Sequence, residues 1–228
     1  MWTRKELKDS AKAGLKRNYW KSVLIGLIVT LAFADTVSNG KESLDESVFT
    51  NAFAGMSSTE ILVGIGLLLL TFLSVSLLSA VVRAVVLNPL KVGISSYCME
   101  ALNGEAKLGT LANGYQPFLR RIWILFVHDL YIMLWSLLFV IPGIVKAYSY
   151  SMVPYICAEN PDISATEALN RSREMMNGNK WKAFVLDLSF LGWNILSAFT
   201  FGILSVFYVE PYKLLTDAAL YEKLKQNS

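Results

Sequence analysis

Apolar residues along the chain gather in runs long enough to cross a lipid bilayer, and polar residues gather between these runs. The longest run covers residues 61–87 and is interrupted only by Arg83. Because a helix rises about 1.5 Å per residue, this run exceeds the roughly 30 Å hydrocarbon core of a bilayer. The other apolar segments cover residues 22–37, 122–141, 144–158, 183–199 and 203–212. The pattern predicts an all-α fold, a polytopic membrane helical bundle with about six transmembrane or re-entrant helices.

The last apolar stretch, residues 181–209, is too long for one comfortable crossing. It is punctuated by Thr200-Phe201-Gly202, a pattern typical of a turn. We expect a helical hairpin, in which residues 183–199 lead outward and residues 203–212 lead back. A single tilted crossing, which would leave the C-terminus outside, is the alternative.

Residues 1–21 have an amphipathic pattern. An apolar stripe with one residue every fourth position runs through basic residues, and it consists of Leu7, Ala11, Leu15 and Tyr19. This predicts a helix on the cytosolic membrane surface, with its stripe in the lipid boundary and its lysines near anionic headgroups. The candidate headgroup contacts, which include a basic pair before the third crossing, are Lys5, Lys8, Lys12, Lys16, Arg17, Arg120 and Arg121. The alternative is that these charges only fix the topology.

Residues 162–178 are predicted to form a second amphipathic helix. Ser164 and Glu167 make an S-x-x-E capping box, which is the sequence signature of a helix start. An apolar face follows until Asn177-Gly178 ends the helix. We expect this helix, too, to lie on the cytosolic surface of the membrane.

Charge is sorted along the chain in a way that predicts the topology. Residues 38–60 form a polar loop whose charges are acidic apart from Lys41. By the positive-inside rule this loop is external, and the basic N-terminus is cytoplasmic. Ala32-Phe33-Ala34 also resembles a signal-peptidase site, so cleavage is the rival to an uncleaved anchor. The favoured interpretation is a multi-pass protein of the plasma membrane.

The composition of the 228 residues agrees with a membrane protein. Hydrophobic residues make up 54% and charged residues only 17%, against roughly 25% charge in a soluble domain. These values exclude a cytosolic enzyme, a disordered regulator and a soluble nucleic-acid binder. The net charge of +3 is too small to suggest a nucleic-acid groove, so we expect no nucleic-acid partner.

The chain offers little material for catalysis. It has a single histidine, and its two cysteines form no C-x-x-C pair. It contains no phosphate-binding loop, no dinucleotide-binding fingerprint, no nucleophile elbow and no zinc-binding H-E-x-x-H. We therefore expect no catalytic residue, no metal site and no cofactor.

A small group of ionisable residues lies in the predicted spans, namely Asp187, Asp129, His128 and Glu210. Because burying such residues in a bilayer is costly, they are a candidate intramembrane polar site for a proton, an ion or a polar substrate. His128 and Asp129 are adjacent, so on a helix we expect their side chains to point about 100° apart. The alternative is that Asp187 binds a neighbouring helix and only stabilises the bundle.

Two sequence patterns occur twice, which suggests an internal repeat. Asn18-Tyr19-Trp20-Lys21 recurs 161 positions later as Asn179-Lys180-Trp181-Lys182. The set Pro89, Lys91, Glu100 and Leu102 recurs 122 positions later as Pro211, Lys213, Glu222 and Leu224. Polytopic proteins are often built from such repeats. Because Trp and Lys collect at membrane interfaces anyway, recurrence without duplication is the alternative.

Several separated blocks, in order, resemble a known family. They are residues 138–150 with Pro142-Gly143, then Ala158-Glu159-Asn160-Pro161, residues 187–193 and Pro211-Tyr212. Together they resemble a bacterial integral membrane family known as domain of unknown function nine hundred and seventy-five. The chain is also remotely similar to the membrane portion of some glycerophosphodiester phosphodiesterases, which accompanies the catalytic domain without supplying its chemistry. The resemblance implies a bacterial membrane protein and carries no activity.

Three functions remain to be weighed. The first is a non-enzymatic scaffold that contacts lipids, anionic ones in particular, or a membrane protein partner. The second is a small transporter or channel component that uses the intramembrane acids. The third, an intramembrane enzyme built on His128, has the least support because no nucleophile or metal set accompanies the histidine. We expect coordinates to separate the first two, by whether the intramembrane acids face one cavity.

Overall fold

The computed structural model describes residues 2–33, 58–200 and 202–226, and no strand occurs among them. The helices, in chain order, are α1 (Arg4–Arg17), α2 (Tyr19–Phe33), α5 (Ser58–Val82), α6 (Asn88–Asn103), α7 (Phe118–Leu138), α8 (Val140–Tyr150), α9 (Val153–Glu159), α10 (Ala165–Met175), α11 (Lys180–Leu188), α12 (Leu191–Phe199) and α13 (Glu210–Lys225). Short π-helices, η1 (Arg83–Leu87) and η3 (Ser205–Val209), precede α6 and α13, and the 3-10 helix η2 (Leu108–Tyr115) follows α6. The all-α prediction is confirmed. The predicted external loop lies outside the described residues except at its end.

Two helical stretches are long and apolar enough to cross a membrane. They are Phe118–Leu138 and Lys180–Phe199, which joins α11 and α12. Their most apolar windows are only 17% and 22% buried inside the protein. A core helix of a soluble protein would be mostly buried, so the exposed apolar surface of these helices needs another apolar environment.

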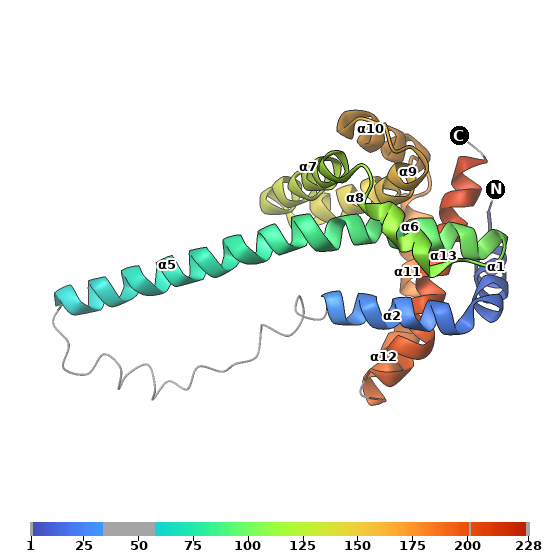
Figure 1. The fold of residues 1–228 in the computed structure, drawn as a ribbon, viewed down its shortest axis with the longest axis horizontal. Coiled ribbons are helices and arrows are strands. Elements are labelled where there is room, and N and C mark those ends of the chain that lie inside the picture. The colour runs from blue at the N-terminus through green and yellow to red at the C-terminus, as the bar shows by residue number, and fades with distance from the viewer. Residues whose placement is uncertain (1, 34–57, 201, 227–228) are drawn as a thin grey trace.

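Helix α5 extends away from the rest of the protein (Figure 1). It is 25 residues long, and its described side chains from Leu62 to Val75 are exposed apart from the half-buried Gly64. Leu62 and Phe72, for example, are 68% and 73% exposed. A free apolar helix of this length cannot remain in water, so lipid or another protein must cover it.

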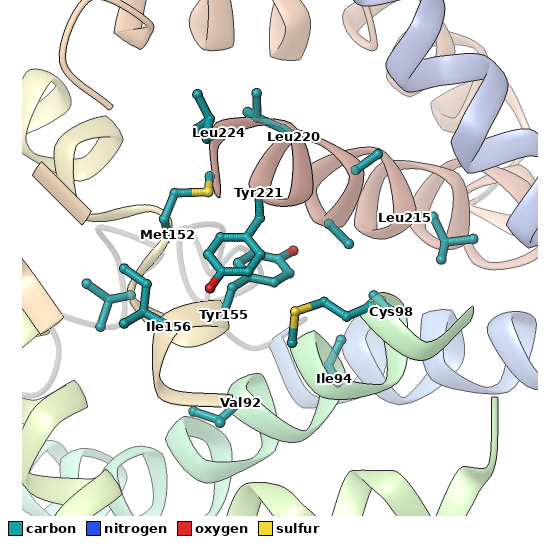
Figure 2. Close-up of a cluster of buried hydrophobic side chains, with 14 of the residues drawn as sticks. Val92, Ile94, Cys98, Met152, Tyr155, Ile156, Leu215, Leu220, Tyr221 and Leu224 are labelled. Atoms are coloured by element: carbon teal, nitrogen blue, oxygen red, sulfur yellow. The ribbon is translucent and has the colours of Figure 1, made fainter. Parts of the chain in front are cut away.

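Helices α6 and α13 form the centre of the core. They pack against each other, and α9 packs on α6. Figure 2 shows Tyr155 of α9 and Tyr221 of α13 face to face between these helices, with Cys98 and Ile156 beside them. The two tyrosine rings are stacked at a centroid distance of 5.3 Å, an arrangement that adds specificity to the buried apolar area.

The chain reverses direction at the predicted hairpin. It runs through α11 and α12, turns at Gly202 with φ of +82°, and returns through α13 (Figure 1). The end of α13 then reaches the start of α1, where Lys223 Nζ lies 2.6 Å from Glu6 Oε1. The two ends of the described chain therefore lie at the same end of the protein.

The apolar stripe of α1 is covered by protein. Leu7 and Ala11 are fully buried and Leu15 is 4% exposed, because α1 packs on α13 and α6. The prediction that this stripe lies in the lipid boundary is therefore wrong for Leu7, Ala11 and Leu15, whereas Tyr19, its fourth member, begins α2 and is 37% exposed. The amphipathic pattern is real, but it matches the apolar surface of two helices instead of that of a membrane.

The same correction applies to α10. Its predicted start is confirmed, because Ser164 Oγ accepts a hydrogen bond from the backbone N–H of Glu167. Its end is followed by Gly178 in a left-handed conformation, with φ of +73°. Its apolar face, including Ala168 and Met175, is buried against protein, since α10 packs on α7, α8 and α9. That face is therefore not available to lie in the membrane surface.

Two pairs of elements share their local structure. Helices α6 and α13 are both 16 residues long, both follow a π-helix of five residues, and both carry proline in their first turn. Helices α1 and α10 both begin at a hydroxyl cap that accepts from the N–H three residues later. After both, an asparagine donates to the carbonyl four residues earlier, Asn18 to Gly14 and Asn179 to Met175.

Glycines allow close packing around α6. A Cβ at Gly93 would collide with the backbone carbonyl oxygen of Leu111 in η2, and one at Gly114 with that of Pro89. The η2 segment is therefore packed closely on α6. Pro89 lies in the first turn of α6, where its missing N–H costs nothing.

Gly93→Ala is expected to lower the thermal unfolding midpoint of the protein in mild detergent. The backbone of Leu111 cannot move aside as a flexible side chain would, and such overpacking costs about 1–3 kcal/mol, or roughly 2–4 °C for each kcal/mol. Gly64→Ala is the matched helical control, because an added Cβ there has no neighbour within 4 Å. Equal midpoints for the two variants would contradict the packing of η2 on α6.

Candidate functional site

A cavity of ≈ 370 Å³ lies where α6, α8, α9, α11 and α13 meet, with Val29 of α2 on one side. Apolar side chains make up part of its wall, and polar groups from several helices converge on it. The charged and hydroxyl-bearing residues of the wall are Lys91, Ser95, Tyr148, Ser151, Tyr155, Asp187, Lys213 and Asp217. A concave, partly apolar site with a few convergent polar groups is the usual form of a small-molecule site.

Asp187 is held in the wall by two partners from other helices. Tyr148 Oη donates to Asp187 Oδ2 at 2.8 Å, and Lys213 Nζ lies 3.4 Å from Asp187 Oδ1. The side chains of Lys213 and Asp187 remain 36% and 33% exposed. Because both side chains line the cavity, a polar solute in the cavity could reach both groups.

Asp217 is the second carboxylate of the wall. It lies one turn after Lys213, so both side chains are on the same face of α13. Burial raises the pKa of Asp217 from its ordinary value of 3.8 to about 7; Lys213 lowers it, and Asp187 and Glu210 raise it. This carboxyl group can therefore gain or lose a proton near neutral pH.

The start of α13 is fixed by tight contacts. A Cβ at Gly26 of α2 would come within 2.8 Å of the carbonyl oxygen of Val206 and 2.9 Å of the Pro211 ring. Glycine therefore lets α2 pack directly on the junction between η3 and α13. Isolated π-helical turns are frequent at functional sites, and here the turn comes just before Lys213.

A stack of two tyrosine rings supports one side of the cavity wall. Tyr155, which lines the cavity, stacks on Tyr221 (Figure 2). Tyr221 Oη in turn donates to Glu159 Oε2 at 2.8 Å, and Lys225 Nζ donates to the other oxygen of Glu159 at 2.6 Å. These bonds tie α9 to α13 and hold the position of Tyr155.

Among the predicted polar candidates, all of which the structure describes, only Asp187 lines the cavity, so the predicted intramembrane acids do not face one cavity. The second acid of the wall, Asp217, was not among them. Asp129 accepts from Asn88 Nδ2 at 3.2 Å, and His128 Nδ1 lies 2.9 Å from Asp129 Oδ1. The expectation that His128 and Asp129 point apart is therefore wrong, because their side chains bend toward each other. Glu210 is half-buried in the first turn of α13 and acts on the cavity only through its charge.

Several candidate headgroup contacts have protein partners. Arg17 Nη2 donates to the carbonyl oxygens of Ala101 and Leu102, and Arg120 Nη1 lies 3.2 Å from Asp162 Oδ1. Arg121 is 2% exposed, so it cannot reach a headgroup, and that prediction is wrong. Its position at the start of α7, which packs on α9 and α10, explains its burial.

The N-terminal lysines stand apart from this group. Lys8 Nζ lies 4.6 Å from the ring centre of Phe190, and Lys12 Nζ lies 6.0 Å from that of Tyr212. Both distances are typical of cation–π interactions. These interactions hold the lysine stems against the aromatic rings of Phe190 and Tyr212. Lys5 and Lys16 are exposed on α1, so a headgroup contact for them stays a prediction.

Lys91, Lys213, Asp217 and Tyr148 are site residues that were not predicted. The spacing of Lys213 and Asp217, four residues apart on a helix, was a usable signal for an i,i+4 pair. The convergence with Asp187 and Tyr148 could not be predicted, because it depends on how α8 and α11 pack beside α13.

Comparisons with known proteins give one match. A family model with the description Protein of unknown function (DUF975) matches residues 113–228. No curated protein and no solved structure matches the chain. The matched part includes Asp187, Lys213, Asp217 and Tyr148, whereas Lys91 lies before it.

Asp217→Asn is expected to change the pH dependence of stability. Between about pH 4 and about pH 7 the folded protein keeps a proton on Asp217 that the unfolded chain has released. The stabilisation is therefore complete below about pH 4 and is lost as the pH rises through about 7. We expect the unfolding midpoint of the wild type to fall relative to that of Asp217→Asn between about pH 5 and about pH 8. A constant difference between the two midpoints would contradict the raised pKa.

Proposed function

The chain belongs to the DUF975 family of proteins of unknown function, and we propose that it is a multi-pass membrane protein whose cavity takes up a small polar solute, as a component of a transporter or channel. The observation that carries this proposal is the convergence of Lys91, Asp187, Lys213 and Asp217 on one cavity. The convergence of charged groups from three helices in so apolar a chain supports a polar occupant of the cavity.

The membrane location is supported by the exposed apolar surface. The windows of Phe118–Leu138 and Lys180–Phe199 are mostly unburied, and α5 adds a further apolar helix that packs on little else. We propose that lipid chains cover these surfaces and that the predicted membrane segments enter the bilayer. In this arrangement the protein lies in a bacterial plasma membrane, and both termini lie in the cytoplasm.

An internal repeat is part of the proposal. The matched pairs η1–α6 and η3–α13, together with the matched caps of α1 and α10, support a duplication of one helical unit. Lys91 and Lys213 occupy equivalent positions in α6 and α13, and both line the cavity. Many transport proteins bind their substrates at the interface between repeats.

We propose a role without catalysis. The cavity wall combines ammonium, carboxylate and hydroxyl groups, and the chain's single histidine is bonded to Asp129 outside this wall. Ser151 Oγ and Ser95 Oγ donate to main-chain carbonyl oxygens, which does not activate them as nucleophiles. Binding and release of a solute need no activated nucleophile.

A scaffold function is the second candidate, and the long exposed helix α5 favours it. A partner helix could cover α5 in place of lipid. Repeated co-purification of one protein in mild detergent, lost when exposed leucines of α5 are replaced, would support the scaffold. Recovery of the protein alone would favour lipid as the covering of α5.

Labelling of an introduced cysteine tests whether the cavity is open to water. Ser151→Cys lines the cavity and is expected to react with a small membrane-impermeant thiol reagent from one side of intact vesicles. The wild type is the matched control, because Cys98 and Cys157 are 2% and 1% exposed and should not react. Absence of labelling of Ser151→Cys from either side would overturn the proposed function.

Reporter fusions test the topology. Lys223 contacts Glu6, which supports the proposal that both chain ends lie on one side of the membrane. We expect fusions at the N-terminus and at the C-terminus to report the same compartment, which is the cytoplasm under the positive-inside rule. Opposite compartments would contradict the hairpin formed by α11, α12 and α13.

A further inference from the structure

The charges of the cavity balance one another. Two ammonium groups, Lys91 and Lys213, face two carboxylates, Asp187 and Asp217, so the fully ionised wall is neutral. An ion of either sign would leave one charge without compensation in a partly buried site, which is costly. A ligand that carries both charges would keep the balance.

The rest of the wall is apolar. Ile94, Leu186, Leu214 and Leu220 line the cavity together with the charged residues. The volume of ≈ 370 Å³ is that of about a dozen liquid water molecules, which is too large for a single ion and sufficient for a small organic solute. The wall therefore offers an apolar surface as well as opposite charges.

We propose that the cavity binds a small zwitterion with an apolar group, such as an α-amino acid with an aliphatic side chain. This inference rests on the proposed function and deepens it. The ligand carboxylate would bind Lys91 and Lys213, and its ammonium group would bind Asp217 and Asp187. The aliphatic side chain would pack on the leucines of the wall.

Protonation of Asp217 links this binding to pH. The titratable and charged groups that face Asp217 are Lys91 and Cys98 of α6, Tyr148 of α8, Tyr155 of α9, Asp187 of α11, and Lys213 and Glu210 of its own helix. A ligand ammonium group needs the ionised carboxylate. Because the pKa of Asp217 is raised to about 7, the ligand should bind more weakly at about pH 5.5 than at about pH 8, and should displace a proton when it binds.

Calorimetry with three probes tests the ligand class on the purified full-length protein. L-Leucine carries both charges, 4-methylpentanoate only the carboxylate, and isopentylamine only the ammonium group. We expect saturable binding of leucine at about pH 8, with weaker or absent binding of the two single-charge probes. Binding of only one single-charge probe, or no binding of leucine, would overturn the inference.

Two variants sharpen the test. Asp217→Asn should weaken leucine binding by roughly ten- to a hundredfold and remove its dependence on pH. Asp162→Asn, at an exposed acid that pairs with Arg120 and does not line the cavity, should leave binding unchanged. Equal effects of both variants, with unchanged unfolding midpoints, would also overturn the inference. If leucine fails to bind while Ser151→Cys is still labelled, the zwitterion is wrong and the proposed function stands.

Discussion

The packing of α6 on α13 is the contact on which the rest of the structure depends. Val92, Tyr97, Leu215 and Tyr221 in these helices are at most 1% exposed. Helix α1 packs on both, α2 on α13, and α9 and η2 on α6. Because Lys91, Lys213 and Asp217 alternate with these core residues along the same two helices, the arrangement that builds the core also brings the charges together.

This arrangement places a constraint on the charges. Lys213 and Asp187 are only about a third exposed, and Asp217 is held where burial raises its pKa to about 7. Partly buried charges are tolerated when each has a partner of opposite sign. The cavity meets this condition with two groups of each sign, so its polar character costs little as long as the balance is kept. Neutralising one of these four side chains would leave a charge of opposite sign without compensation. Protonation of Asp217 and binding of a ligand are therefore expected to affect each other.

Much of the fold could be predicted from the sequence, because it depends on local patterns. Apolar runs predicted the helices, the capping box at Ser164 predicted the start of α10, and Thr200-Phe201-Gly202 predicted the reversal before α13. The wrong predictions concern whether lipid or protein covers an apolar helix surface. The apolar stripes of α1 and α10 fit lipid and protein equally well by pattern, and only the packing shows that protein covers them. The site was predicted in part, since Asp187 was identified from its cost in a span, while Lys213 and Asp217 join it through tertiary contacts that no local pattern encodes.

We propose that the cavity between α6 and α13 is a polar binding site inside a membrane-embedded protein. A density map of the protein in a lipid nanodisc, recorded with and without L-leucine, would show what covers α5 and what the cavity holds. We predict acyl-chain density along α5 and α7, with the charged cavity holding water alone or a compact ligand between Lys213 and Asp217. Acyl-chain density inside the cavity, or solvent around α5, would contradict the account.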